Sequence, residues 1–383
     1  MPTLIHRDVA ALAPVIRGFK EKIRTPAPER FSGLCGFDGF IDTFVRLQSP
    51  PSMAEFGPKV AAAAGVAASY PARHLGDKFG GNGPLFAAAL HDIYAGKIDV
   101  TYIGALGHPE VLPIFQAALG AKTKRLYTLG RAAQTTCLEF TDGKIMLNDM
   151  SACTEVTWDR LLECVGPAAL DEALKAARFI SAVNWGKLPQ AGEIWSQLAA
   201  RLGQLGVPAK KVFYFMDLAD FETRPVVERE ELVARLGPIT RQCETLLSFN
   251  LKEAWQMAEV FGGAYHGRKD ADAVAELTTY LRSRLAVDRV VVHPNNGAAC
   301  ASADATVYVP GPYCADPLIS TGAGDNFGAG CLAAALQGLD DAGLVLAGNC
   351  ASGHFVRSGR SATFADMEKL LTAWAAGTLA ERL

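Results

Sequence analysis

The 383-residue sequence predicts an α/β fold with a mostly parallel central sheet covered by helices, and with a small separate β-sheet beside it. Strand-like and helix-like runs alternate from about residue 84 onward. A single hairpin pattern interrupts this alternation. Hydrophobic residues make up 50% of the chain and charged residues 20%, which is the composition of a globular protein with a large core.

The alternation is the evidence for a parallel sheet. The helix-like GPLFAAALHDIYAG precedes the apolar, β-branched run IDVTYIGALG. Similar pairs follow: RFISAVNW with GEIWSQLAARLGQLG, KKVFYFMDLA with a charged helix, and TLLSFN with LKEAWQMAEVFG. Apolar strands separated by helices of this length are typical of a parallel sheet buried on both faces. No repeat or low-complexity linker divides the chain, so we expect residues 1–383 to form a single domain.

The hairpin pattern predicts a lid. Residues 134–148 read QTTCLEFTDGKIMLN, and Asp-Gly between two alternating runs is a strong hairpin signal. Such a hairpin would project as a separate sheet, although an edge hairpin on the main sheet is the alternative. Residues 43–58 contain three prolines and are predicted to be a loop or the edge of this lid. The strands, 135–140 and 144–147, each have one apolar face, so we expect either a lid-mediated homodimer or a lid folded onto its own domain.

Charge and composition exclude several classes of partner. Lys plus Arg is 37 and Asp plus Glu is 40, a net charge of −3, which argues against a nucleic-acid partner. The longest run of small residues, 60–69, is shorter than the roughly 20 residues that span a bilayer. Nine cysteines without a C-x-x-C pair indicate reduced thiols, and the first twenty residues lack the pattern of a signal peptide. We therefore expect a cytoplasmic protein without a membrane partner.

The segment PLISTGAGDNFGAGCLAAALQG, residues 317–338, is the strongest indication of chemistry. The backbone N–H groups of Gly322, Ala323 and Gly324 can converge on one anion at the start of a helix, where the helix dipole adds positive charge. Asp325 follows at the helix start. Aspartate is also a common structural residue at that position. However, an N–H cradle beside a carboxylate suits phosphoryl transfer to a hydroxyl, because the carboxylate can accept the hydroxyl proton.

The run Thr321-Gly322-Ala323-Gly324-Asp325, followed by Asn326-Phe327, resembles the C-terminal signature of the ribokinase (PfkB) family of carbohydrate kinases. Further similarities follow the family's order: GGNG at residues 80–83, TYIGALG at 101–107, NLKE at 250–253, and the strand and turn at 290–297. The resemblance covers about residues 32–375. It implies a ribokinase-like three-layer sandwich and an ATP-dependent kinase that phosphorylates a hydroxyl of a sugar or sugar-like molecule. Asp325 would be the general base and residues 322–324 the anion hole.

The resemblance also implies ATP and Mg²⁺ as cofactors. Asn250 and Glu253 would organise water around Mg²⁺ and the phosphates, which fits an ion that keeps several of its waters. Their i, i+3 spacing equally suits a capping pair at a helix start. Thr321, Gly297 and Asn349 would lie on the nucleotide side, although Asn349 could be an ordinary helix residue.

The sugar side would be formed by two short motifs. In GFDGFID, residues 36–42, Asp42 matches the family's substrate-binding position best and Asp38 is a close competitor. Either could instead be a turn residue beside glycine. Gly80 and Gly81 would let the backbone approach the ligand, and Asn82 could supply an amide contact.

The sequence departs from the family pattern at several positions. Ile319 stands where the signature usually begins with Asp, a residue associated with a monovalent-cation site, so potassium activation is not expected. Leu85 replaces a usual Asn, and the first thirty residues and region 43–78 have no counterpart. A nucleoside kinase of the same fold is the nearest alternative function. A non-catalytic sugar- or nucleotide-binding regulator is another, whereas a dehydrogenase would need the G-x-G-x-x-G motif that this chain lacks.

Overall fold

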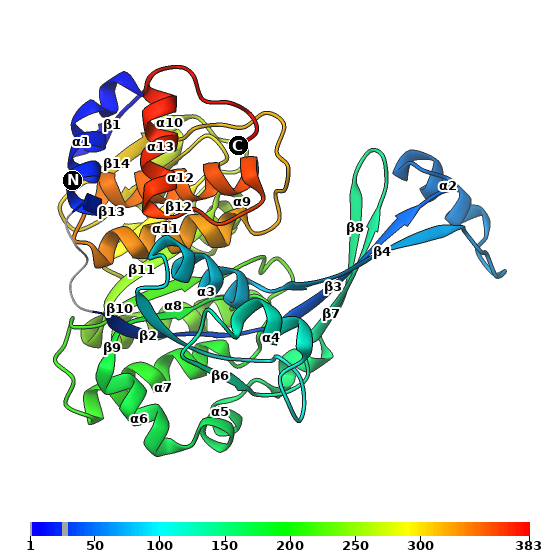
Figure 1. Cartoon of the computed structure of the whole chain (residues 1–383), viewed down its shortest axis with the longest axis horizontal. Helices are drawn as coiled ribbons and strands as arrows, with labels where there is room; N and C mark the ends of the chain where they lie inside the picture. The colour runs from blue at the N-terminus through cyan, green and yellow to red at the C-terminus, as the bar shows by residue number, and fades with distance from the viewer. Residues whose placement is uncertain (1, 25–29) are drawn as a thin grey trace.

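A ten-stranded sheet forms the body of the protein in a computed structural model that describes residues 2–24 and 30–383 (Figure 1). In spatial order its strands are β1 (Thr3–Ile5), β14 (Thr306–Pro310), β13 (Gly297–Ala301), β12 (Arg289–His293), β11 (Glu244–Asn250), β10 (Phe213–Asp217), β9 (Ala177–Ala182), β2 (Phe31–Phe37), β5 (Ile98–Gly104) and β6 (Arg125–Thr128). Neighbouring strands are parallel except that β13 runs antiparallel to both β12 and β14. The predicted mostly parallel sheet is confirmed.

Helices cover both faces of this sheet. One face packs against α5 (Trp158–Val165), α6 (Pro167–Ala176), α7 (Ala191–Gln204), α8 (Val226–Gln242), α9 (Leu251–Val260) and α10 (Ala271–Arg284). The other packs against α1 (Ala13–Arg24), α3 (Asn82–Ile93), α4 (Pro113–Leu119), α11 (Ala323–Leu336), α12 (Asp341–Ser358) and α13 (Phe364–Ala375). Strand β12 contributes side chains to the hydrophobic core on each face of the sheet, since Val290 and Val292 belong to the core on the first face and Val291 to the core on the second. This alternation explains why the strand reads as an unbroken apolar run.

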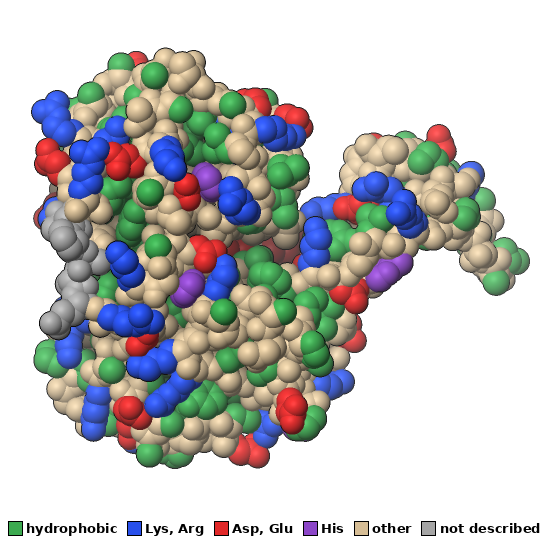
Figure 2. Space-filling model, viewed as in Figure 1, with side chains coloured by type: hydrophobic (Ala, Val, Ile, Leu, Met, Phe, Trp, Pro, Cys, Tyr) green, Lys and Arg blue, Asp and Glu red, His purple; other side chains and the backbone are tan. Residues whose placement is uncertain are grey.

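The second sheet is the lid. Its order is β4 (Ala72–Gly80), β3 (Phe40–Leu47), β7 (Ala133–Glu139) and β8 (Lys144–Asp149). The hairpin around Asp142 pairs Glu139 with Lys144, so the turn lies where Asp-Gly predicts it. Figure 1 shows the lid extending away from the body, with α2 (Met53–Ala62) at its far end. In Figure 2 only the base of the lid meets the body.

The lid is larger than the sequence indicates. Residues 43–58, expected to be a loop or the edge of the lid, contain most of β3 and the start of α2, and β4 was not expected. Strand β3 joins two hairpins, because it pairs antiparallel with β4 and parallel with β7. The Asp142 carboxylate also accepts hydrogen bonds from the backbone N–H groups of Met53, at 2.7 Å, and Ala54, at 3.3 Å. The turn residue therefore connects the two halves of the lid.

Other parts of the chain complete the body. Strand β1, which was not expected, extends the sheet by pairing parallel with β14. Two short 3-10 helices cover Ala10–Leu12 and Ser151–Glu155. Within the described ranges, no helix has both the length and the apolar character needed to cross a bilayer.

Candidate active site

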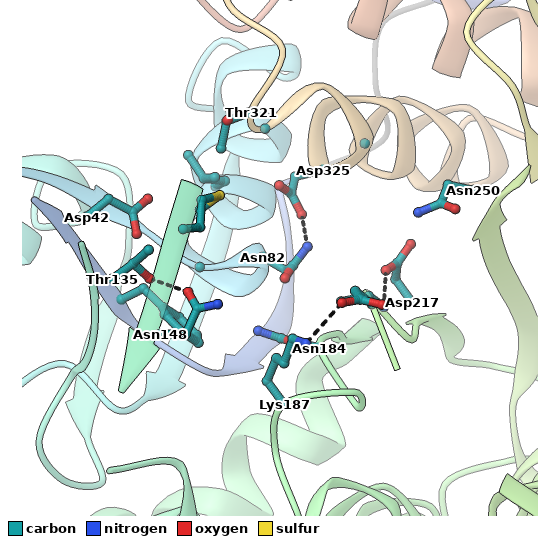
Figure 3. Close-up of a pocket in the computed structure, with 18 of the residues that line it drawn as sticks. Asp42, Asn82, Thr135, Asn148, Asn184, Lys187, Asp217, Asn250, Thr321 and Asp325 are labelled. Atoms are coloured by element: carbon teal, nitrogen blue, oxygen red, sulfur yellow. Dashed lines mark hydrogen bonds and ion pairs between the residues drawn. The ribbon is translucent and has the colours of Figure 1, made fainter. Parts of the chain in front are cut away.

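A cavity of about 410 Å³ lies where the carboxyl ends of the central strands meet the base of the lid. This is the edge at which open parallel sheets bind ligands. Many polar residues from both parts of the molecule line it: Asp42, Asn82, Thr135, Asn148, Asn184, Lys187, Asp217, Asp220, Asn250, Glu253, His293, Thr321 and Asp325. Glycines and the apolar Phe40, Leu85 and Met146 make up most of the rest. Figure 3 shows the labelled side chains around the cavity. Asp42, Thr135 and Asn148 lie on one side, and Asn250 and Asp217 lie on the other.

The start of α11 forms an open anion cradle in this cavity. Gly322 is the N-cap, with φ of 93° in the left-handed region that favours glycine, and no side chain caps the helix. Gly324 in the first turn is exposed. The N-terminal N–H groups of a helix without a side-chain cap are available to an anion where they have no other acceptor. Here the Ala323 N–H donates to the Ser320 carbonyl at 3.2 Å, so of the three predicted donors only those of Gly322 and Gly324 remain without a partner in the described residues.

Asp325 lies in the first turn of α11 and lines the same cavity. Its Oδ1 accepts a hydrogen bond of 2.9 Å from Nδ2 of Asn82, which begins α3 (Figure 3). Desolvation raises the pKa of Asp325 well above its usual range, and the nearby Asp217 raises it further. A carboxylate with a raised pKa is a more effective proton acceptor near neutral pH.

Asp38 lies beneath the cavity, not in its lining. Its side chain is fully buried, and it accepts hydrogen bonds from the backbone N–H groups of Asn82 and Gly83, both at 2.8 Å, and from Nδ2 of Asn184 at 2.6 Å. Burial raises the pKa of Asp38 to about 6, against the effect of these hydrogen bonds. The residue fixes the start of α3, and with it the side chain that contacts Asp325.

The glycines of the GGNG motif are needed for close packing against these carboxylates. A Cβ atom on Gly80 would lie 2.4 Å from Oδ2 of Asp42, and one on Gly81 would lie 2.8 Å from Oδ2 of Asp38. Gly81 also has φ of 99°. Neither glycine can therefore be replaced without moving a carboxylate.

Asp42 lines the cavity from the lid strand β3. It is 7% exposed, and its neighbour Thr135 on β7 donates its hydroxyl to Asn148 on β8 at 3.0 Å. Desolvation raises the pKa of Asp42, whereas Thr135 and Lys144 lower it. The structure thus separates the two candidate aspartates, with Asp42 in the wall and Asp38 behind it.

Asn250 and Glu253 form the capping box that their spacing allows. The Asn250 side chain accepts from the Glu253 N–H, and the Glu253 carboxylate accepts from the Asn250 N–H, each at 3.0 Å. Glu253 is 4% exposed, and desolvation together with Asp217 raises its pKa well above its usual range. The capping role is therefore real, and it leaves a buried carboxyl group in the wall of the cavity.

The donor set suits Mg²⁺. Among the described residues, no Lys, Arg or His nitrogen lies within 4 Å of the carboxylates of Asp217, Glu253 or Asp325. Besides desolvation, the nearby Asp217 raises the pKa of both Glu253 and Asp325. No group of three or more His, Cys, Asp or Glu side chains closes around a single point in the described ranges. Uncompensated carboxylates without a closed cage fit an ion that retains most of its waters.

A second cavity of about 530 Å³ adjoins the first and shares Asn250, His293 and Gly324 with it. Asn349 lines it, while its Nδ2 donates to the carbonyl of Val309 at 3.1 Å. Gly297 does not line either cavity, and a Cβ there would lie 2.4 Å from the Tyr308 hydroxyl. Of the residues predicted for the nucleotide side, Thr321 lines the first cavity and Asn349 lines the second. Gly297 packs behind them.

Sequence reasoning missed several residues of the site. Asn184, Asp217 and His293 each stand at or just after the end of a central strand, β9, β10 and β12 respectively. A polar residue directly after an apolar run was the available signal. Desolvation lowers the pKa of His293 to about 4, so the ring is neutral, and it stacks on Phe327 with 4.3 Å between centroids.

The lid contributes a further missed residue. Lys144, the first residue of β8, donates a hydrogen bond of 2.9 Å to the Thr321 hydroxyl beside the anion cradle. Glu139, its partner in the strand register, instead pairs with Arg46 at 2.8 Å. In the described part of the chain, no carboxylate lies within 4 Å of the Lys144 ammonium. No local sequence pattern indicates this contact, because it depends on how the lid meets the body.

The fold and this site define a carbohydrate kinase of the ribokinase type, which transfers a phosphoryl group to a hydroxyl. A family model of prokaryotic ketohexokinases matches residues 21–374, and the chain belongs to that family. A ketohexokinase from Haloferax volcanii is 26% identical over 375 residues, covering 94% of this chain and 95% of the relative. The predicted resemblance is confirmed, and the alternative of a non-catalytic regulator is not supported.

Solved structures agree on the fold. Arabidopsis thaliana ribokinase complexed with ribose and ATP has a TM-score of 0.63 at 15% identity, over 91% of this chain and 99% of that one. An Escherichia coli structure described as a ribokinase II in complex with ATP and Mg²⁺ has a TM-score of 0.61 at 14% identity, over 89% and 98%.

Proposed function

We propose that this chain is an ATP-dependent ketohexokinase, transferring the γ-phosphoryl group of ATP to a hydroxyl of a ketohexose. The single observation that carries the proposal is the position of Asp325. It lies in the first turn of α11 and lines the cavity at the base of the lid, while the preceding Gly324 lines both this cavity and the second one, which would hold the nucleotide.

Asp325 acts as the general base. Its free carboxylate oxygen accepts the proton of the sugar hydroxyl while that hydroxyl oxygen bonds to phosphorus and the bond from phosphorus to the leaving diphosphate oxygen breaks. Asn82 holds the other oxygen at 2.9 Å and so orients the carboxylate. The N–H groups of Gly322 and Gly324 stabilise the charge on the transferring group, and that of Ala323 would join them by leaving the Ser320 carbonyl.

Glu253, with Asn250 and Asp217 beside it, would hold Mg²⁺ through its water shell. The ion would neutralise phosphate charge when bound. Support comes from the uncompensated carboxylates of the cavity and from the relatives solved with ATP or with ATP and Mg²⁺. Thr321 and Asn349 would contact the nucleotide from the two cavities.

The sugar side favours a neutral polyol. Among the described residues, five carboxylates line the first cavity, and the one lysine there, Lys187, is paired with Asp220 at 3.2 Å. Carboxylates accept hydrogen bonds from vicinal hydroxyls but repel a phosphate already on the sugar. Asp42 and Asn82 would contact the substrate directly, with Gly80 and Gly81 shaping the wall, and Asp38 would act by fixing Asn82.

Lys144 supplies positive charge from the lid. Its ammonium already lies at Thr321, one residue before the cradle, and without a carboxylate partner it can turn to a phosphate oxygen. Such a contact would link closure of the lid to the presence of the nucleotide.

The lid would also join two subunits. Leu75 and Leu147 on its strands are 40% and 55% exposed, and the lid extends away from its own body (Figure 1). Pairing with the same sheet of a second copy would bury these side chains.

A phosphoryl-transfer assay against ketohexoses, aldohexoses, polyols, sugar phosphates and nucleosides tests the function. We expect ADP release to depend on a ketohexose, and to be weak with sugar phosphates. ADP release that depends on a nucleoside instead would support the nucleoside-kinase alternative.

A further inference from the structure

Residues 311–322 form one irregular loop between β14 and α11. Its first part, including Pro312, Tyr313 and Pro317, lines the second cavity. Its last part carries Thr321 and the N-cap Gly322. A loop without secondary structure must find partners for its backbone carbonyls elsewhere.

Arg357 of α12 provides several of those partners. Its Nη1 donates to the carbonyls of Pro312, at 2.8 Å, and Gly353, at 3.0 Å, and its Nη2 donates to the carbonyl of Tyr313 at 2.6 Å. Its Nε donates to the carbonyl of Ala380 at 3.0 Å. The side chain is 2% exposed, and within the described ranges no carboxylate lies within 4 Å of it. Carbonyl oxygens are thus its direct hydrogen-bond partners, and it also interacts electrostatically with the Glu381 carboxylate beyond that distance.

The segment 380–383 covers the same loop from outside. The Ala315 N–H donates to a carboxylate oxygen of Glu381 at 3.0 Å, and Arg382 pairs with Asp316 at 2.6 Å. Since Arg357 bonds to Ala380, the guanidinium connects the loop, α12 and this segment. Burying a cation is costly unless its hydrogen bonds are satisfied, so the bonds from Arg357 to these carbonyls offset the cost of its burial.

We propose that Arg357 is a positioning residue for the nucleotide: by holding the Pro312 and Tyr313 carbonyls, it keeps residues 311–322 in the shape that binds the nucleotide. The inference rests on the proposed function, because the second cavity is taken as the nucleotide side. Arg357 itself does not line either cavity, so it acts through the loop. Lysine cannot replace it, because an ammonium lacks the planar fork that reaches four carbonyls.

The test is calorimetric binding of a non-hydrolysable ATP analogue with Mg²⁺ to the full chain. Arg357→Lys should weaken the Kd by at least about tenfold, as expected when two or more charge-assisted hydrogen bonds are lost. The KM for the sugar should change little. Arg360→Lys, an exposed arginine just after the end of the same helix, is the matched control and should leave the Kd unchanged.

Two outcomes are decisive. A folded Arg357→Lys protein with a wild-type Kd and a lower Tm would overturn the proposal, leaving Arg357 a purely stabilising role. If that variant does not fold, the same binding measurement is made on the double variant Glu381→Ala/Arg382→Ala. A Kd for the ATP analogue weakened roughly threefold supports the proposal, and an unchanged Kd overturns it. Failure of the wild-type chain to bind the nucleotide would instead refute the proposed function.

Discussion

Replacing Asp325 by Asn is the most informative single change at the site. The side chain keeps its shape, and the amide oxygen of the variant could still accept the 2.9 Å hydrogen bond from Asn82, so the start of α11 should be preserved. What disappears is the proton acceptor. Loss of a general base lowers kcat by roughly 10²–10⁴, equivalent to about 3–5 kcal/mol in the barrier.

Asp325→Asn should lower the catalytic rate but not the stability of the folded protein. Desolvation raises the pKa of Asp325, so its ionised form costs folding free energy. That cost appears as pH rises from the unfolded-state pKa, about 3.9, through the raised folded value. At neutral pH the Asn variant should therefore have a Tm equal to or above that of the wild type. In the wild type, kcat/KM should rise with pH as Asp325 ionises.

The assay combines steady-state kinetics, thermal melting and nucleotide-analogue binding. Asp340→Asn is the matched control, because Asp340 caps the next helix through a 2.8 Å bond from Gly343 N–H and has no place in either cavity. The control should keep its kcat. If Asp325→Asn also kept near-full kcat on the true substrate, Asp325 would not be the base.

Four further predictions concern the metal, the lid and monovalent ions. Glu253→Gln should raise the Mg²⁺ concentration needed for half-maximal rate, because a negative charge leaves the metal's surroundings while Gln still suits a capping box; an unchanged titration with a lower Tm would leave only the capping role. Lys144→Met should lower kcat/KM for ATP roughly tenfold, whereas Lys59→Met elsewhere on the lid should not; equal effects would argue against phosphate contact. With Ile319 in place of a carboxylate, exchanging sodium for potassium should change the rate little, and a large saturable potassium activation would contradict this. Deleting residues 136–147 should raise ATP hydrolysis relative to sugar phosphorylation and give monomers in light scattering, and unchanged coupling and mass would remove both roles of the lid.

The fold could be predicted because its signals are local. The apolar run Val290–Val292 and the small-residue helix after Gly322 each indicate a buried element from composition alone. Asp-Gly likewise indicates the hairpin turn. Strand β4, reading ARHLGDKFG, has little apolar character because most of its side chains are exposed. Its place in the lid comes from pairing with β3, which local composition does not encode.

The site was predictable only where residues are adjacent in sequence. The cradle and Asp325 lie in one segment, as do Asn250 and Glu253. Asn184 and Asp217 required knowing which strand ends meet, and Lys144 required knowing where the lid rests. The sequence also could not separate Asp38 from Asp42, because four residues along one segment place one carboxylate under α3 and the other in the cavity wall.

The most direct test of the proposed function is the product of the reaction. Purified protein is incubated with Mg²⁺, ATP and a ketohexose such as fructose, and phosphorus NMR follows the phosphate. We predict one sugar phosphoester for each ADP formed, and neither product from Asp325→Asn on the same timescale. ADP formed without a sugar phosphoester, or no ADP formed with any ketohexose, would contradict the assignment.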